Sequence, residues 1–350
     1  MNPTAEILSA KLRRINGGKD PNDLELAGVL KDAVREAIDE AQAAKRGRFP
    51  FLYPAQMVEV EHDEELIESW LPEGGIHLLY APKDCFKSFL AVDWFLCVAS
   101  GRAWNGWQAK QGPAIYIAGE GNRGLRRRFN AWCIRHRIAF ESLPIAVSQW
   151  PMQALDADNV AQWSEHIAEV EAHYGARARF VVVDTLATNF GPGDENAPTD
   201  MARFLAMLAI HIKRSPSTTI LVVHHSGKDE SRGARGGSSI EGNAEAVFTL
   251  ARVKDSERAV ELACKHIKDG EKPPTMRLIA RTVELGTTDR HGDPLTSLVL
   301  DMELTEREQR VLDNLKAGKS QRDVARLLGL KSNTPVVRIA RRLRQMGLLA

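Results

Sequence analysis

The sequence has few cysteines, and they do not cluster. Only four occur in 350 residues, at widely separated positions: Cys85, Cys97, Cys133 and Cys264. They form no CxxC pair and no Cys/His cluster, so their spacing suggests neither a zinc site nor a disulfide framework. We expect these thiols to be free and buried.

Long hydrophobic runs are also missing. The apolar stretches are short, as at residues 180–183 and 220–223, and none approaches the roughly 20 residues that a membrane-spanning helix needs. The N-terminal stretch MNPTAEILSAKLRRINGG contains neither an apolar segment nor a small-residue cleavage site of the kind that export signals carry. We therefore expect a cytoplasmic protein without a membrane segment.

The chain has no excess of charge of one sign. Its 47 basic and 46 acidic side chains leave a formal net charge of +1, so the overall charge identifies no partner. The charges are nevertheless unevenly distributed. Residues 1–75 carry 15 acidic and 9 basic side chains, whereas residues 304–350 carry 4 acidic and 11 basic ones. The C-terminal end is therefore the basic one.

Changes of composition divide the chain into four parts. Residues 1–47 have a polar, helical pattern, and the prolines and aromatics of RFPFLYPA indicate a linker over residues 48–74. In residues 75–300, short β-branched runs alternate with helical stretches up to about Arg252, and strands joined by turns follow. This pattern predicts an α/β fold with a mostly parallel sheet, crossover helices on both faces and a β-rich edge. Residues 304–350 form a small helical module.

The first chemical motif lacks the glycines that usually define it. The strand IHLLY is followed by APKDCFKS and then by a helical stretch, which is the strand–loop–helix order of the phosphate-binding pattern GxxxxGK[ST]. In such a loop the backbone N–H groups and a lysine bind phosphates, and the hydroxyl binds Mg²⁺. Lys87 and Ser88 fit these two roles, but Ala81 and Phe86 replace the two glycines.

We expect this loop to supply the nucleotide contacts through one continuous set of residues: Ala81, Pro82, Lys83, Asp84, Cys85, Phe86, Lys87, Ser88 and Phe89. Taken alone, the motif is equally consistent with an ordinary strand-to-helix turn that contains a Lys-Ser pair. Other parts of the sequence are needed to decide between these readings.

Three further strands end in polar side chains. RFVVVDT places Asp184 at the end of an apolar strand, the form of a Walker B strand whose carboxylate orients Mg²⁺ or its waters. AIYIAGEG places Glu120 where it can orient an attacking water, and TILVVHH ends in His225, a candidate sensor of the γ-phosphate. Because ligands of parallel α/β sheets bind at the carboxyl ends of the strands, we expect these side chains to converge near Lys87.

The order of these motifs resembles the RepA-type hexameric ATPases of plasmids and bacteriophages, which are relatives of RecA and of the DnaB replicative helicases. The similar segments are GGIHLLYAPKDCFKSF, IYIAGEGNRGLRRRF, FVVVDTLATNFGPGDENAPTDMARFL and ILVVHHSGKDESRGARGGSS. The resemblance implies a RecA-like core, a ring-shaped oligomer, ATP hydrolysis with Mg²⁺ and movement on single-stranded DNA.

The resemblance also implies roles for individual residues. Lys87 and Ser88 match the Walker A pair, Glu120 the catalytic glutamate, Asp184 the Walker B acid and His225 the strand-end histidine. With Ser88 and Asp184 as metal ligands, the expected cofactors are ATP and Mg²⁺.

RecA-like rings hold ATP between subunits, so a neighbouring subunit is expected to supply a cation to the γ-phosphate. CKHIKDG resembles the late β-hairpin that carries this cation in DnaB-type enzymes, which makes Lys268 the first candidate and Lys265 the second. The alternative is a solvated hairpin. Arg232 and Arg235 lie in a glycine-rich loop after the histidine strand and are candidates for DNA contact, for the trans-acting cation, or for ordinary solvated arginines.

Arg126–Arg128 follow the Glu120 strand on a predicted helix. We interpret this arginine run as a solvated helix face or a subunit contact.

The basic C-terminus predicts three short helices. TERE has the form of a capping box, and Ser320 opens a second helix that Gly329 ends. Thr334 is expected to cap the third helix, with Pro335 at its first position. This arrangement resembles a helix-turn-helix DNA-binding module. On the third helix Arg338, Arg341 and Arg342 are expected to face outward and contact DNA. A helical bundle for protein contacts is the alternative.

Together these features predict a Mg²⁺-dependent ATPase that acts on DNA. The favoured interpretation is a ring-forming, hexameric replicative helicase or a recombination-associated motor that binds single-stranded DNA. Two alternatives stay open: a non-motor DNA-binding regulator with a degenerate phosphate loop, and an ATPase that loads other proteins on DNA.

Overall fold

The computed structural model describes residues 64–350 except 120, 121, 227–236, 255, 347 and 350. The expected N-terminal helical extension, residues 1–47, and most of the expected linker therefore lie outside the described residues. No helix in the described part of the chain is long and apolar enough to cross a membrane.

One large sheet organises the described part of the chain. It contains nine strands in the order β11-β10-β9-β8-β3-β7-β6-β4-β5. The strands from β8 to β5 in this order are parallel to one another, and β8 to β11 pair in antiparallel fashion. The bounds of the nine strands are β3 (Ile76–Ala81), β4 (Ala114–Ala118), β5 (Ile145–Val147), β6 (Phe180–Asp184), β7 (Thr219–His225), β8 (Ala246–Arg252), β9 (Ala259–Ile267), β10 (Met276–Thr288) and β11 (Pro294–Met302).

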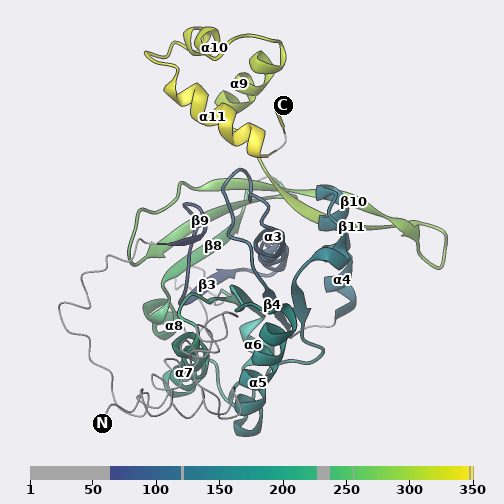
Figure 1. The fold of residues 1–350 in the computed structure, drawn as a ribbon, viewed down its shortest axis with the longest axis vertical. Coiled ribbons are helices and arrows are strands. Elements are labelled where there is room, and N and C mark those ends of the chain that lie inside the picture. Colours follow the sequence, from purple (N-terminus) through teal and green to yellow (C-terminus); the bar gives the residue numbers. More distant parts are fainter. Residues whose placement is uncertain (1–63, 120–121, 227–236, 255, 347, 350) are drawn as a thin grey trace, which may run out of the picture. The chain divides into compact units, whose positions relative to one another are not determined.

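Helices cover both faces of this sheet (Figure 1). Their bounds are α3 (Lys87–Ser100), α4 (Asn122–His136), α5 (Ala157–Tyr174), α6 (Leu186–Asn189), α7 (Pro198–Arg214) and α8 (Gly237–Asn243), with a 3₁₀ turn at Phe140–Ser142. The fold class predicted from the sequence, an α/β fold with a mostly parallel sheet and helices on both faces, is confirmed.

The two faces of the sheet have separate cores. On one face, residues of α3 and α4 such as Phe95 and Phe129 pack against alternate strand residues; on the other, Trp163 of α5 and Phe204 of α7 pack against the intervening ones. The neighbouring strands β4 and β6 are buried along their whole length. Burial on both faces explains why these strands are continuously apolar rather than alternating.

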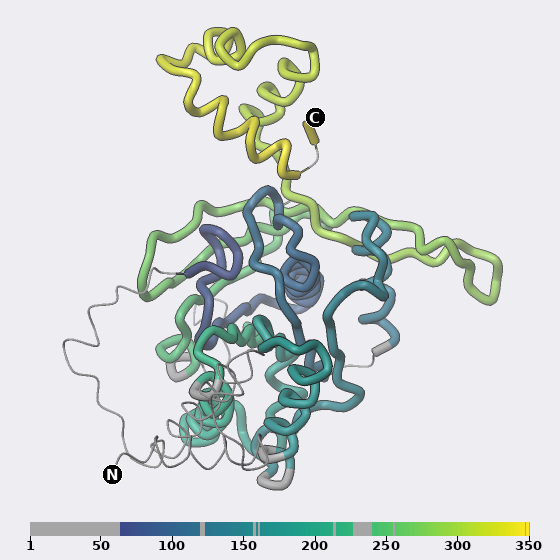
Figure 2. The backbone as a smooth tube through the Cα atoms, viewed as in Figure 1, coloured from purple at the N-terminus to yellow at the C-terminus, as the bar shows by residue number. Residues whose placement is uncertain are grey.

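The β-rich edge predicted after Arg252 is formed by β9, β10 and β11. Strands β10 and β11 make a long hairpin that extends beyond the other strands (Figures 1 and 2). The hairpin also lies beside α4, and Arg135 of that helix donates to Asp301 of β11 at 2.9 Å. The edge therefore completes the sheet and contacts the helix that follows β4.

The end of the expected linker differs from the prediction. Residues 65–72 form a two-stranded antiparallel sheet of β1 (Glu65–Ile67) and β2 (Leu71–Pro72). Leu66, Ile67 and Trp70 are at most 1% exposed and belong to the core that contains α3. Their apolar side chains are buried by distant segments, including the loop around Trp104, which the local composition does not reveal.

A buried carboxyl group ties α3 to its surroundings. Asp93 of α3 is 5% exposed and accepts hydrogen bonds from the indole N–H groups of Trp104 and Trp132, each at 2.7 Å. Burial raises the pKa of the Asp93 carboxyl to about 7, and the two indole bonds oppose that rise. The contact joins the helix after the phosphate-loop motif to α4 and to the loop around Trp104.

The C-terminal residues form three helices, α9 (Glu306–Lys316), α10 (Gln321–Leu327) and α11 (Thr334–Gln345), around a small core of their own. The expected capping box is present: Thr305 and Glu308 exchange side-chain and backbone hydrogen bonds. Helix α11 begins at Thr334, so the capping position is occupied by Asn333 and not by Thr334.

One arginine of α11 is placed differently from the prediction. Arg338 and Arg341 are exposed as expected. Arg342 instead forms an ion pair with Glu308 of α9 and lies over the Trp107 ring, 5.1 Å from its centroid. Burial lowers the pKa of its guanidinium. The prediction that Arg342 faces outward is wrong, because the Glu308 carboxylate and the indole face compete with solvent for its side chain.

Candidate functional site

The ends of four neighbouring parallel strands place the predicted site residues at one edge of the sheet. The registers pair Ala81 of β3 with His225 of β7, and Asp184 of β6 with Val223 of β7. On the other side of β6, Asp184 pairs with Ala118, the last residue of β4. The phosphate-loop motif, Asp184 and His225 therefore meet at the same edge, as parallel pairing requires.

Glu120 follows β4 by two residues but lies outside the described residues. The nearest described position is Gly119, whose backbone N–H donates to the Asp184 carbonyl at 2.7 Å. The chain thus leaves β4 beside the end of the Asp184 strand. A side chain on Gly119 would collide with Thr188, whose hydroxyl oxygen would lie 1.7 Å from an added Cβ. This close approach requires glycine at position 119.

The loop between β3 and α3 takes backbone conformations that glycine normally supplies. Phe86 has φ 58° and ψ 22°, and Asp84 has φ 61°. Residues other than glycine rarely adopt this left-handed region because their Cβ crowds the backbone. Phe86 nevertheless closes the first turn of α3: its carbonyl accepts from the N–H groups of Phe89 and Leu90, each at 3.0 Å. The loop therefore has a glycine-like turn without glycine.

Lys87 is held inside this loop. It is 6% exposed, and its ammonium donates to the carbonyls of Ala81 at 3.0 Å and Pro82 at 2.7 Å. Ser88 is the second residue of α3 and is half-buried. Both lie at the N-terminus of a 14-residue helix, where N–H groups without intrahelical partners and the helix dipole favour anions. The residues present fit a bound nucleotide phosphate.

Asp184 has a partner that the sequence did not single out. The carboxylate is 7% exposed, and its Oδ2 accepts a hydrogen bond from the Tyr116 hydroxyl at 2.5 Å. Burial and the neighbouring Asp184 charge raise the pKa of Tyr116 well above its ordinary value, so the tyrosine stays a hydrogen-bond donor. The sequence signal was a single tyrosine inside the otherwise aliphatic strand AIYIA. The acid at the end of β6 is therefore oriented by the neighbouring strand.

Two arginines outside the predicted set lie on the aromatic side chains of the loop. The guanidinium carbon of Arg252 is 4.9 Å from the Phe86 ring centroid, and that of Arg128 is 4.6 Å from the Phe89 ring centroid. Arg252 also donates to the Asp84 carbonyl. The interpretation of Arg126–Arg128 as one solvated face thus holds for the exposed Arg126 and Arg127 but not for Arg128, which packs against the helix that begins with Lys87.

The two lysines predicted to act in trans bond to acidic side chains of their own chain. Lys268 donates to the Glu245 carboxylate at 2.9 Å. Glu245 lies immediately before β8, and its backbone N–H donates to the carbonyl of Ile76, the first residue of β3. Lys268 therefore lies on the side of the sheet where the parallel strands begin. The phosphate loop and Lys87 lie on the opposite side, where these strands end. Lys265 donates to Glu241 at 2.9 Å and to the Tyr80 hydroxyl at 3.0 Å. Arg232 and Arg235 lie outside the described residues.

The family model of the AAA domain matches residues 45–231, more than half of the chain. No curated protein has a sequence that matches this one. Among solved structures, a KaiC-like protein from the hyperthermophilic archaeon Pyrococcus horikoshii OT3 is similar over 61% of this chain and 88% of its own, with 18% identity and a TM-score of 0.45. The RadB recombinase is similar over 59% of this chain and 87% of its own, with 14% identity and a TM-score of 0.43.

Both TM-scores are below 0.5, so the assignment rests on the matched domain and on the loop at the end of β3. The matched range contains the phosphate loop, β4 and the Asp184 strand. The chain belongs to the AAA domain family, and its core is a P-loop ATPase domain.

Proposed function

We propose that the protein is a Mg²⁺-dependent ATPase that acts on DNA, as a ring-forming helicase or a recombination-associated motor. The observation that carries the proposal is that the buried Lys87, the half-buried Ser88 and the buried Asp184 lie at the ends of neighbouring parallel strands. The interior lysine and the glycine-like turn before it also support phosphate binding by this loop.

The proposed reaction transfers the γ-phosphoryl group of ATP to water. Lys87 would stabilise charge on the phosphates, and Ser88 and Asp184 would hold Mg²⁺, which neutralises charge on the β- and γ-oxygens when it is bound. Tyr116 keeps the Asp184 carboxylate oriented. Glu120 is the proposed residue that positions the water.

His225 and the trans-acting cation complete the proposed site. His225 lies at the strand end next to Ala81, and this position supports the proposal that it senses the γ-phosphate. Lys268 is proposed to act on the nucleotide of a neighbouring subunit, because it lies at the edge of the sheet opposite to the loop of its own chain. A ring of six subunits would bring the two ends of the sheet together.

DNA contact is proposed for two regions. On α11 the exposed Arg338 and Arg341 remain candidates, whereas Arg342 is used within the module. Arg232 and Arg235 are proposed to contact single-stranded DNA from the loop after β7. Since each phosphate contact releases counterions, affinity should fall with added salt, with a slope of roughly −0.9 per contact on duplex DNA.

ATP turnover of the full chain with and without single-stranded DNA tests the proposal. We expect turnover that DNA stimulates and that Lys87→Ala abolishes. Lys254→Ala is the matched control, because Lys254 is an exposed lysine of the β8–β9 turn outside the proposed site. Retention of full turnover by Lys87→Ala would remove the assignment of the site.

A forked DNA substrate separates the motor from its alternative. A helicase displaces the annealed strand when ATP is present, whereas an ATPase that loads other proteins on DNA hydrolyses ATP without displacing it. A protein that binds DNA but neither binds nor hydrolyses ATP would instead be a non-motor regulator.

A further inference from the structure

The phosphate loop has left-handed backbone angles at two residues that are not glycine. Phe86 and Asp84 both adopt left-handed backbone angles, with φ of 58° and 61°. For residues other than glycine such angles persist only where surrounding contacts impose them. A loop of this kind therefore needs partners from elsewhere in the fold.

Arg252 supplies such partners from the strand beside the loop. Strands β8 and β3 are parallel, and Thr249 pairs with Tyr80. Arg252 lies three residues further along β8, so it reaches the edge at which β3 turns into the loop. Its guanidinium donates to the Asp84 carbonyl and lies over the Phe86 ring, 4.9 Å from the centroid. One side chain thus contacts both residues that have left-handed angles.

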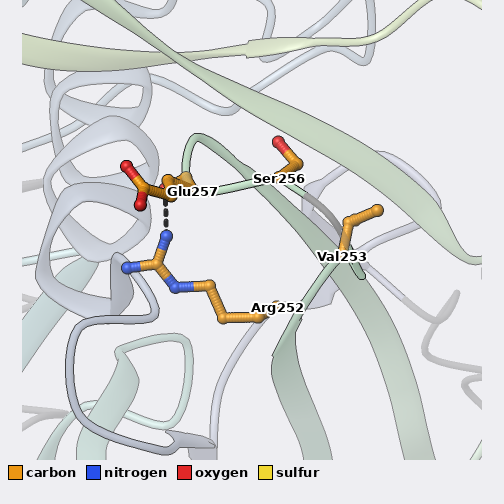
Figure 3. Close-up of a pocket in the computed structure, with 4 residues that line it drawn as sticks. All are labelled: Arg252, Val253, Ser256 and Glu257. Atoms are coloured by element: carbon orange, nitrogen blue, oxygen red, sulfur yellow. Dashed lines mark hydrogen bonds between the residues drawn. The ribbon is translucent and has the colours of Figure 1, made fainter.

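The orientation of Arg252 is set by the β8–β9 turn. A second guanidinium nitrogen donates to the Glu257 carbonyl, as Figure 3 shows within a pocket lined by Arg252, Val253, Ser256 and Glu257. The turn is itself closed by backbone bonds, including Ser256 N–H to the Val253 carbonyl at 3.2 Å. The Arg252 guanidinium therefore bridges the closed β8–β9 turn and the phosphate loop.

We propose that Arg252 is a positioning residue that holds the glycine-free phosphate loop in its nucleotide-binding shape. The role rests on the proposed ATPase function of the loop. The flat face of the guanidinium contacts the Phe86 ring while two of its nitrogens donate hydrogen bonds. A lysine ammonium cannot make these contacts at the same time. A loop with glycine at position 86 would need this support less, because glycine adopts positive φ without a steric penalty.

The first experiment measures amide hydrogen exchange of the full chain without nucleotide. The reporters are the amides of Phe89 and Leu90, which bond to the Phe86 carbonyl. Losing the ring contact and the charged hydrogen bond in Arg252→Ala should accelerate their exchange about tenfold. Exchange of the same amides should also be faster in Arg252→Lys, although by a smaller factor. The control Arg258→Ala removes an exposed arginine of the same turn that contacts Thr282 and should not change these amides.

The second experiment measures the KM for ATP and the kcat in the same variants and in a Phe86→Gly background. Arg252→Ala should raise the KM about tenfold in the wild-type loop, with a smaller change in kcat. In the Phe86→Gly background the same substitution should have a clearly smaller effect, because the ring is gone and the backbone no longer resists the turn.

Wild-type exchange of the Phe89 and Leu90 amides in Arg252→Ala would overturn the positioning role. If the KM for ATP were raised at the same time, the arginine would act on the nucleotide and not on the loop. Absence of ATP turnover in the wild-type chain would contradict the proposed function, and the exchange measurement would still decide the role of Arg252, since it requires no nucleotide.

Discussion

The buried carboxyl group of Asp93 should make the protein less stable as the pH rises. The pKa of Asp93 is about 7 in the folded chain because of burial, against 3.8 for an aspartate exposed to water. Below about pH 3.8 both states are protonated and the full stability is present. As the pH rises further, the unfolded chain releases its proton first, so stability is lost until the pH passes the folded value near 7.

The size of this effect follows from the shift. A pKa difference of one unit corresponds to about 1.4 kcal/mol, so the whole shift is on the order of 4 kcal/mol. Between pH 4.5 and 7 the loss should be about 3 kcal/mol in the free energy of unfolding. Other groups titrate in the same range, so the comparison must be made with a variant in which only Asp93 cannot titrate.

Asp93→Asn provides that comparison, because asparagine has nearly the same shape and no proton to lose. We expect the variant to be less stable than wild type at pH 4.5, since one oxygen replaces two as acceptor for Trp104 and Trp132. The difference between the two proteins should shrink by about 3 kcal/mol on going to pH 7.

Urea unfolding followed by tryptophan fluorescence at several pH values measures this difference, and both indole partners are direct reporters. Asp313→Asn, at an exposed carboxylate of α9, is the control and should keep the wild-type pH dependence. If the wild type and Asp93→Asn lose stability in parallel from pH 4.5 to 7, the Asp93 carboxyl does not titrate as argued and the reasoning is wrong.

Two further predictions concern the site and the C-terminal module. Tyr116→Phe removes the donor to Asp184, and loss of such an orienting contact should lower Mg²⁺ affinity about 10- to 100-fold; a Mg²⁺ titration of ATP turnover checks this, and an unchanged titration contradicts it. Arg342→Ala should lower the melting temperature of the C-terminal module because Glu308 loses its ion-pair partner. Arg341→Ala should keep the melting temperature and reduce the salt slope of DNA binding by about 0.9. Equal effects of the two substitutions on stability would contradict the placement of Arg342.

Much of the fold could be predicted because its signals are local. Apolar runs such as FVVVD and TILVVHH indicated buried parallel strands, and the structure has β6 and β7 there. The capping box at Thr305 was also visible, since its partners are three residues apart. Parallel pairing then brings the strand ends together, so the meeting of Lys87, Asp184 and His225 at one edge followed from strand order alone.

Contacts between distant segments could not be predicted in the same way. The burial of Trp70 by the loop around Trp104, and the ion pair of Arg342 with Glu308, depend on which segments pack together. Neither composition nor periodicity specifies a partner 34 residues away. This is why the β1–β2 segment was predicted as linker and Arg342 as a DNA-facing residue.

In the phosphate loop, too, some features follow from the local sequence and others depend on contacts between distant segments. The sequence alone determined that a lysine and a serine follow a buried strand and open a helix, and that both glycines of the usual pattern are absent. Only the tertiary structure decided how such a loop keeps its shape. The left-handed turn at Phe86 is contacted by Arg252 from a strand that lies far away in sequence and adjacent in the sheet, because register, and not sequence distance, sets which side chains meet.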